Sequence, residues 1–292
     1  MDKLLKAEGI YKSYKDKSVL MGLDLCIEPG KIYGLIGRNG VGKTTLLGIL
    51  TAQNTMDSGS VTYGGEPVWE NRKALDDLCF SRELSSTSYS GQNTYKVEWY
   101  LKAARDFYPH WDEEYAQKLM GLFSLDQKKK INALSKGQMS MVTIVIALAS
   151  RAPITILDEP VAGLDVVMRE KFYSLLLDDH METGRTFVVS THIIDEAAGV
   201  FEEVIIMDEG KIIEKAPTEE LISQFAYISG HEAQVDKAVR GLQVLSTHSM
   251  GRHMTASVRG ITPEWQTDAD VDVSPMNLQK VFVALCSHGE EM

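Results

Sequence analysis

The segment LIGRNGVGKTT places three glycines, one lysine and two threonines directly after an apolar run. From Gly37 to Thr44 it fits the phosphate-binding pattern G-x-x-x-x-G-K-[ST]. Gly40 and Gly42 would let backbone N–H groups approach an anion, and the helix that follows would add its positive N-terminal end. Lys43 could then reach the terminal phosphates, and the Thr44 hydroxyl could hold Mg²⁺. The segment therefore predicts a cradle for a nucleoside triphosphate, with a plain glycine-rich turn as the alternative.

A pair of carboxylates follows a second apolar run, in the segment ITILDEP. The four apolar residues predict a buried strand that ends at Asp158, on the edge where ligands bind in open α/β sheets. There Asp158 can ligate Mg²⁺ through water, and Glu159 can polarise a water that attacks the terminal phosphate. The alternative is a solvated acidic turn before Pro160, which the glycine loop makes the weaker interpretation.

Short apolar runs are expected to position these groups. ITIL at 154–157 and FVVS at 187–190 are typical of buried parallel strands, and a helix is expected between them at 166–183. Two strands precede the glycine loop, and LLGIL after it starts a helix. Strand, glycine loop and helix form the context that a phosphate loop requires, so an α/β fold is predicted.

The chain divides into a larger and a smaller part. Aromatic, Leu and Ala residues at helical spacing predict a helical subdomain over about 94–150. The composition shifts near residue 225. We therefore expect one domain over 1–225 and a small C-terminal α+β domain over 226–292, with short strands and a final helix.

Composition excludes several classes of protein. The net charge of −11 argues against a nucleic-acid partner, which usually needs a basic face. Three scattered cysteines predict reduced thiols rather than a disulfide framework or a zinc site. The longest apolar helical run, MVTIVIALAS, is about half the length of a spanning helix, so neither a membrane span nor an export signal is expected.

A third motif, LSKGQ, lies twenty residues before Asp158. The ordered set GRNGVGKTT, LSKGQ, ITILDEP, AGLD and STH resembles the ATP-binding subunits of ABC transporters over about residues 4–222. The resemblance implies a P-loop, RecA-like α/β core with an antiparallel β subdomain and a helical subdomain. It also implies that two copies face head to tail and enclose MgATP between them.

The resemblance assigns ATP-binding roles to the glycine loop and to an aromatic residue near the N-terminus. Tyr14 matches the residue that stacks on adenine, and Tyr11 is a weaker competitor. The ATP-binding set implied by the family is Tyr14, Gly37, Arg38, Asn39, Gly40, Val41, Gly42, Lys43, Thr44 and Thr45.

Other roles carry over from the remaining motifs. Ser135, Gly137 and Gln138 would contact the ATP of the partner copy, although Ser135 alone reads as an ordinary helix N-cap. His192 matches the switch histidine that bonds the terminal phosphate beside the catalytic Glu159. Asp165 matches the loop that links the two active sites across the dimer.

The chain departs from the family pattern at some positions. Lys136 stands where the signature usually has glycine, and Val161 stands where Thr or Ser is usual. The family also places a metal-binding glutamine after a strand, beyond the phosphate loop. Here Glu83 occupies that position and would join Thr44 and Asp158 as a metal ligand, with Gln92 as the alternative.

The sequence thus predicts an ATP-hydrolysing subunit, most similar to bacterial exporter-type subunits whose membrane permease is a separate chain. It would lie in the cytoplasm, on the inner face of the cell membrane, with a peptide or other amphipathic compound as cargo. The membrane partner would dock near 84–110, where Tyr89, Tyr95, Trp99 and Tyr100 could line a groove or pack in the core. The alternatives are an ABC ATPase or scaffold that serves partners outside the membrane.

Overall fold

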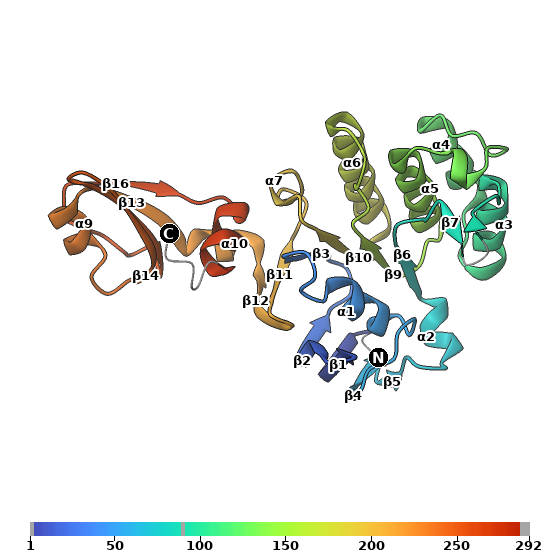
Figure 1. Ribbon diagram of the computed structural model, residues 1–292, viewed down its shortest axis with the longest axis horizontal. Coiled ribbons are helices and arrows are strands. Elements are labelled where there is room, and N and C mark those ends of the chain that lie inside the picture. The colour runs from blue at the N-terminus through green and yellow to red at the C-terminus, as the bar shows by residue number, and fades with distance from the viewer. Residues whose placement is uncertain (1–2, 89–90, 287–292) are drawn as a thin grey trace. The chain divides into compact units, whose positions relative to one another are not determined.

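The computed structural model describes residues 3–88 and 91–286, and Figure 1 shows its elements. The chain forms two compact units. One comprises the residues up to Phe201 together with Ile205–Glu214, and the other comprises Glu202–Val204 together with the residues from Lys215 onward.

A six-stranded sheet has the order β12-β11-β3-β10-β9-β6. Its strands are β3 (Ile32–Gly37), β6 (Leu78–Ser81), β9 (Ile154–Asp158), β10 (Thr186–Thr191), β11 (Glu203–Asp208) and β12 (Lys211–Pro217). Strands β3, β10, β9 and β6 run parallel. Every residue of β3, β9 and β10 is buried, as expected for strands covered on both faces. The register sets Ser190 of β10 opposite Asp158 of β9 and Leu35 of β3, so the carboxyl ends of these strands meet at one edge.

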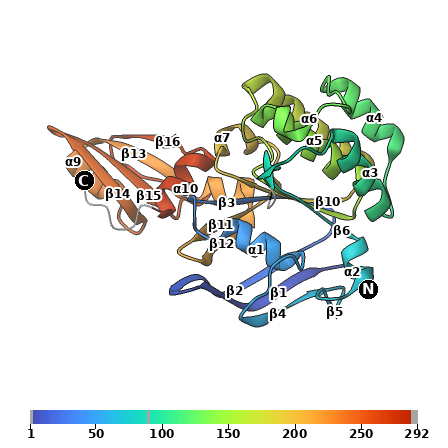
Figure 2. The same ribbon diagram turned by 45° about the vertical axis from the view of Figure 1, so that its right-hand side comes forward.

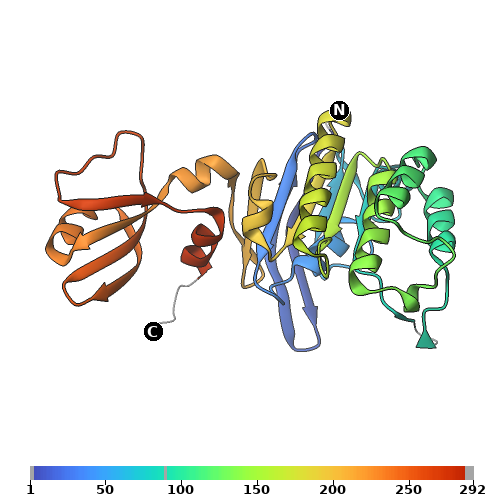
Figure 3. The same ribbon diagram turned by 90° about the horizontal axis from the view of Figure 1, so that it is seen from above.

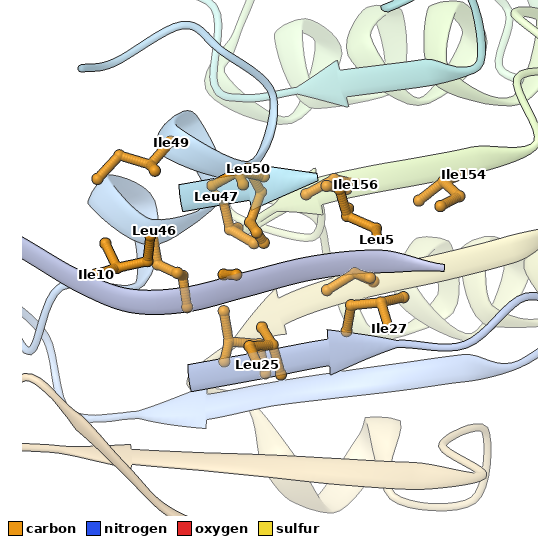
Figure 4. Close-up of a cluster of buried hydrophobic side chains, with 14 of the residues drawn as sticks. Leu5, Ile10, Leu25, Ile27, Leu46, Leu47, Ile49, Leu50, Ile154 and Ile156 are labelled. Atoms are coloured by element: carbon orange, nitrogen blue, oxygen red, sulfur yellow. The ribbon is translucent and has the colours of Figure 1, made fainter. Parts of the chain in front are cut away.

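A second, antiparallel sheet has the order β2-β1-β4-β5. It consists of β1 (Leu5–Tyr14), β2 (Lys17–Ile27), β4 (Ser58–Tyr63) and β5 (Glu66–Pro67). Helix α1 (Lys43–Leu50) lies between this sheet and the six-stranded one (Figure 2). Figure 4 shows the core that results, with α1 packed against both sheets. Its labelled side chains are Leu5, Ile10, Leu25, Ile27, Leu46, Leu47, Ile49, Leu50, Ile154 and Ile156. The helix that begins at the phosphate loop is therefore fixed by apolar burial on two sides.

Helices make up much of the rest of the first unit. They are α2 (Arg72–Asp76), α3 (Val97–Phe107), α4 (Glu113–Leu122), a 3-10 turn (Ile131–Ala133), α5 (Lys136–Ala149), α6 (Val166–Thr183) and α7 (Ile194–Ala197). Helices α3, α4 and α5, drawn in green in Figure 3, gather on one side of the unit. They fall within the range 94–150 that was expected to be helical. A short hairpin of β7 (Thr87–Ser88) and β8 (Gly91–Gln92) precedes them.

A buried ion cluster ties these helices to the sheet. Arg185 donates to both carboxylate oxygens of Asp179, with each N–O distance 2.7 Å. Arg151 Nη1 lies 3.2 Å from the same carboxylate, and its Nη2 lies 3.1 Å from Asp112. Asp112 caps α4 by accepting from the backbone N–H of Tyr115. The cluster joins the C-terminal ends of α5 and α6 to the start of α4.

The second unit is a small α+β structure. It contains α8 (Thr218–Ser223), β13 (Phe225–His231), α9 (Glu232–Ala238), β14 (Gln243–Met250), β15 (His253–Arg259), β16 (Val271–Pro275) and α10 (Leu278–Cys286). Its sheet has the order β14-β15-β13-β16, with antiparallel neighbours. Helix α8 packs against β13 and α10, so the unit begins near Lys215, earlier than the boundary expected at 226. Strand β13 and helix α9 had no counterpart in the elements expected from the sequence.

Candidate phosphate-binding site

The glycine loop holds the Lys43 side chain against backbone carbonyl groups of the same loop. Gly40 and Gly42 have φ values of +80° and +112°, in the left-handed region that favours glycine. Lys43 Nζ donates to the carbonyl oxygens of Gly37, at 2.6 Å, and Arg38, at 3.3 Å. Only 6% of the Lys43 residue is exposed. The loop therefore holds a buried ammonium at the N-terminal end of α1.

Burial lowers the pKa of the Lys43 ammonium, and the carboxylates of Glu159 and Asp158 oppose that shift. Lys43 Nζ lies 4.0 Å from Glu159 Oε1. A partly uncompensated cation in this position favours an anion that could replace its contacts to backbone carbonyls.

A pocket of about 290 Å³ opens beside this loop. Its lining residues are Tyr14, Val19, Asn39, Gly40, Gly42, Lys43, Thr44, Thr45, Asp158 and Glu159. The structure thus brings most of the expected ATP-binding residues together with the acidic pair. Gly37, Arg38 and Val41 complete the loop, since the N–H of Val41 donates to the Arg38 carbonyl. Val19 was not expected in the lining.

Asp158 and Thr44 form the part of the pocket that suits a hard cation. Thr44 Oγ1 donates to Asp158 Oδ2 at 2.6 Å, and the Ser190 hydroxyl donates to Oδ1. Among the described residues there is no cluster of three His, Cys, Asp or Glu side chains that could hold a metal. Mg²⁺ needs no such cluster, because it is usually held by one or two protein oxygens together with substrate phosphates and water. The hydroxyl and the carboxylate fit that requirement.

Glu159 and His192 form a hydrogen-bonded pair beside the pocket. His192 Nδ1 lies 2.7 Å from Glu159 Oε2. The backbone N–H of Glu159 donates to the Ser190 carbonyl at 3.1 Å. Glu159 has a φ of +50°, which is uncommon for a residue other than glycine. This turn aims the carboxylate from the end of β9 toward the residue that follows β10.

The signature segment forms the start of α5. Ser135 Oγ accepts from the backbone N–H of Gln138, and Gln138 Oε1 accepts from the backbone N–H of Ser135, both at 3.2 Å. This reciprocal pair is a capping box. Asp165 likewise caps α6 by accepting from the N–H of Met168 at 2.9 Å. Within one copy these residues shape two helix N-termini and do not line the pocket, so their expected contacts with a partner's ATP stay predictions.

The two candidates for the metal-binding position after β6 both point elsewhere. Glu83 Oε1 lies 3.2 Å from Lys136 Nζ. Gln92 Oε1 accepts from Asn132 Nδ2 at 3.0 Å. Neither residue lines the pocket, so a metal-binding role for either stays a prediction.

The aromatic residues expected near 84–110 divide into two groups. Tyr95 and Trp99 are about half exposed and stack with ring centroids 4.6 Å apart. Tyr100 is partly buried, and its hydroxyl accepts from Asn93 Nδ2 at 2.7 Å. Tyr89 lies outside the described residues.

Two further expectations concern the whole chain. Among the described residues, Cys26, Cys79 and Cys286 are not joined in a disulfide. Within residues 3–88 and 91–286, no helix combines the length and apolar character needed to span a membrane.

Comparisons with known proteins agree with this geometry. Residues 20–162 match the family described as ABC transporter. The ABC transporter ATP-binding protein YtrB of Bacillus subtilis is 25% identical, with 96% of this chain and 97% of that protein covered. The uncharacterized ABC transporter ATP-binding protein MJ1023 of Methanocaldococcus jannaschii is 28% identical, with 77% and 81% covered. The ATP-binding cassette MJ0796, in a dimeric post-hydrolysis state bound to ADP and Pi, matches with a TM-score of 0.64 and 24% identity, with 73% and 98% covered.

A parallel sheet with a phosphate loop after β3 and an acidic pair after β9 defines a P-loop nucleotide-binding protein. Together with the family match over residues 20–162, this shows that the chain carries an ABC transporter ATP-binding domain.

Proposed function

We propose that this chain binds and hydrolyses MgATP in a head-to-tail homodimer, and that this cycle drives transport through a separate membrane permease. The observation that carries the proposal is the convergence of Lys43, Thr44, Asp158 and Glu159 on one pocket, with His192 bonded to Glu159. These side chains come from three segments of the chain, so their proximity is a property of the fold.

The residues divide the chemistry between them. The N–H groups of the glycine loop and the Lys43 ammonium bind the phosphates. Thr44 and Asp158 would hold Mg²⁺, which when bound would neutralise charge on the transferred phosphoryl group. Glu159 accepts a hydrogen bond from the attacking water and orients it, and His192 holds the Glu159 carboxylate in place. The nucleobase stacks on the half-exposed ring of Tyr14.

The second copy completes the site. The N-terminus of α5, with Ser135, Gly137 and Gln138, presents backbone N–H groups that suit an anion. In one copy this terminus is not part of the pocket, so we infer that it binds the terminal phosphate held by a partner. Asp165 lies at the start of α6 and would link the two active sites across the dimer. The dimeric state of the MJ0796 cassette bound to ADP and Pi supports this arrangement.

Exposed aromatic residues in α3 and just before it support a membrane partner. Tyr95, Trp99 and Phe107 are 54%, 48% and 68% exposed, although aromatic residues of this size are usually mostly buried. We assign this surface to the docking of the permease at the cytoplasmic face of the membrane. Export of a peptide or another amphipathic compound is the direction and cargo that the sequence resemblance supports.

A Glu159→Gln variant tests the proposal. The amide keeps the shape of the side chain but is a much weaker proton acceptor, so the variant should bind ATP, hydrolyse it at least about a hundredfold more slowly and accumulate as a dimer. Phosphate release and light scattering with MgATP would measure both effects. Glu170→Gln, an acidic residue on α6 outside the pocket, is the matched control and should behave as the parent chain. Full hydrolysis by Glu159→Gln would refute the assigned role, and a parent chain that neither pairs nor releases phosphate, even with its permease, would refute the function.

A further inference from the structure

Lys136 places a positive charge at an unfavourable position. It is the first residue of α5, and no acidic residue stands in the first turn of that helix. A cation at a helix N-terminus adds to the positive end of the helix dipole. The compensating charge comes from a distant part of the sequence, because Glu83 Oε1 lies 3.2 Å from Lys136 Nζ. The two side chains are 49% and 55% exposed, respectively, so the contact is accessible to salt and water.

The aliphatic part of Lys136 contacts the loop before α6. A Cβ atom on Gly163 would lie 2.8 Å from Lys136 Cγ, so the lysine occupies the space of a side chain at that position. A Cβ atom on Gly137 would lie 2.6 Å from the Gly163 carbonyl oxygen. Ser140 Oγ donates to the Ala162 carbonyl at 2.6 Å. The start of α5 is therefore closely fitted to the backbone at 162–163.

Strand β6 is attached to the same helix further along. Ser81, the last residue of β6, donates its hydroxyl to the Thr143 carbonyl in α5 at 3.2 Å. Glu83 follows two residues later and returns to the first turn of that helix. Lys136 thus joins three segments: the residues after β6, the tip of α5 and the loop before α6.

We propose that Glu83 and Lys136 form a positioning ion pair that sets the tip of α5 for the terminal phosphate of ATP bound to a second copy of this chain. The inference rests on the proposed function, because Ser135 and Gly137 are the groups assigned to that phosphate. By binding the Lys136 ammonium, Glu83 fixes the backbone between Ser135 and Gly137. Glu83 then acts through Lys136 and does not act as a metal ligand.

A double-mutant cycle tests the pair. Glu83→Gln should raise the ATP concentration for half-maximal hydrolysis by about two- to fivefold, the effect expected of a half-exposed ion pair, with little change in the saturated rate. In a chain that carries Lys136→Met, which keeps the aliphatic stem, the same Glu83→Gln substitution should change nothing. Lys136→Arg keeps the charge and should behave as the parent chain. At about 0.5 M salt the effect of Glu83→Gln should disappear, because an exposed pair is screened.

Two results would overturn the inference while leaving the proposed function intact. One is that Glu83→Gln raises the ATP concentration for half-maximal hydrolysis equally whether position 136 carries lysine or methionine. The other is a shift in the Mg²⁺ concentration needed for activity that is independent of position 136, since that would make Glu83 a metal ligand. A parent chain that neither hydrolyses ATP nor pairs would overturn the proposed function, and this inference with it.

Discussion

Replacing the buried carboxylate of Asp179 should destabilise the first unit strongly. Asp179 is fully buried, and the Arg185 side chain that it binds is 5% exposed. Asp179→Asn keeps the shape of the side chain but leaves the guanidinium groups of Arg185 and Arg151 facing a neutral amide. Removing one partner of a buried ion pair costs about 3–5 kcal/mol. For a unit of roughly 200 residues, each kcal/mol lowers the melting temperature by about 2–4 °C, so a fall of about 6–20 °C is expected.

Scanning calorimetry of the nucleotide-free chain would measure this fall, with the transition of the first unit followed separately from that of the second. Glu98→Gln is the matched control, because the Lys96–Glu98 pair has a similar N–O distance of 3.0 Å but is about half exposed. Such a pair contributes at most about 1 kcal/mol. A fall of less than about 2 °C for Asp179→Asn would refute the view that this ion cluster holds the helices to the sheet.

Three further predictions concern the site and the core. Burial lowers the pKa of Lys43, so its positive charge destabilises the folded state at neutral pH. This cost decreases only as the pH rises toward the pKa that Lys43 has in the unfolded chain. Lys43→Met should therefore melt no lower than the parent chain without nucleotide, yet lose the roughly 2.7 kcal/mol that MgATP gives the parent at a hundred times its Kd; a thermal shift with MgATP in the variant would contradict this. Gly137→Ala should lower the free energy of unfolding by about 1–3 kcal/mol and abolish hydrolysis, because the new Cβ would lie 2.6 Å from the Gly163 carbonyl oxygen. Gly121→Ala is the control, since the space around that position is open, and it should change neither property. Melting and phosphate-release assays measure the two effects. The Cys79 thiol is fully buried and burial raises its pKa, so iodoacetamide should modify it only on unfolding, as mass spectrometry can show; rapid labelling in the folded chain would exclude this packing.

The elements that carry the chemistry could be predicted closely from the sequence. The apolar run at 154–157 became β9 (Ile154–Asp158), and the helix expected at 166–183 has those bounds in the structure. These elements are bounded by strong local signals. The helix ends at Gly184, which has a φ of +66° and therefore adopts the left-handed conformation typical of a helix end.

Other features depend on contacts that no local pattern reveals. Strand β1 carries two lysines and a glutamate, because its side chains alternate between the core and solvent, and no ten-residue strand was expected there. Ser190 gave no signal inside an apolar strand, and its partner Asp158 lies 32 residues away. The pairing of Glu83 with Lys136 joins residues more than fifty positions apart. Such contacts follow from sheet order and helix packing rather than from spacing along the chain.

The left-handed backbone conformation of Glu159 affects which residue selection for stability would favour at this position. A backbone of this kind at a residue other than glycine is strained by about 1–3 kcal/mol, and it persists only where the surroundings enforce it. Glycine would be the relaxed choice at this position, and a search for heat-resistant variants that ignored turnover should select it. The backbone strain at this one residue therefore sets thermal stability against ATP hydrolysis, because the residue that best suits the backbone lacks the carboxylate.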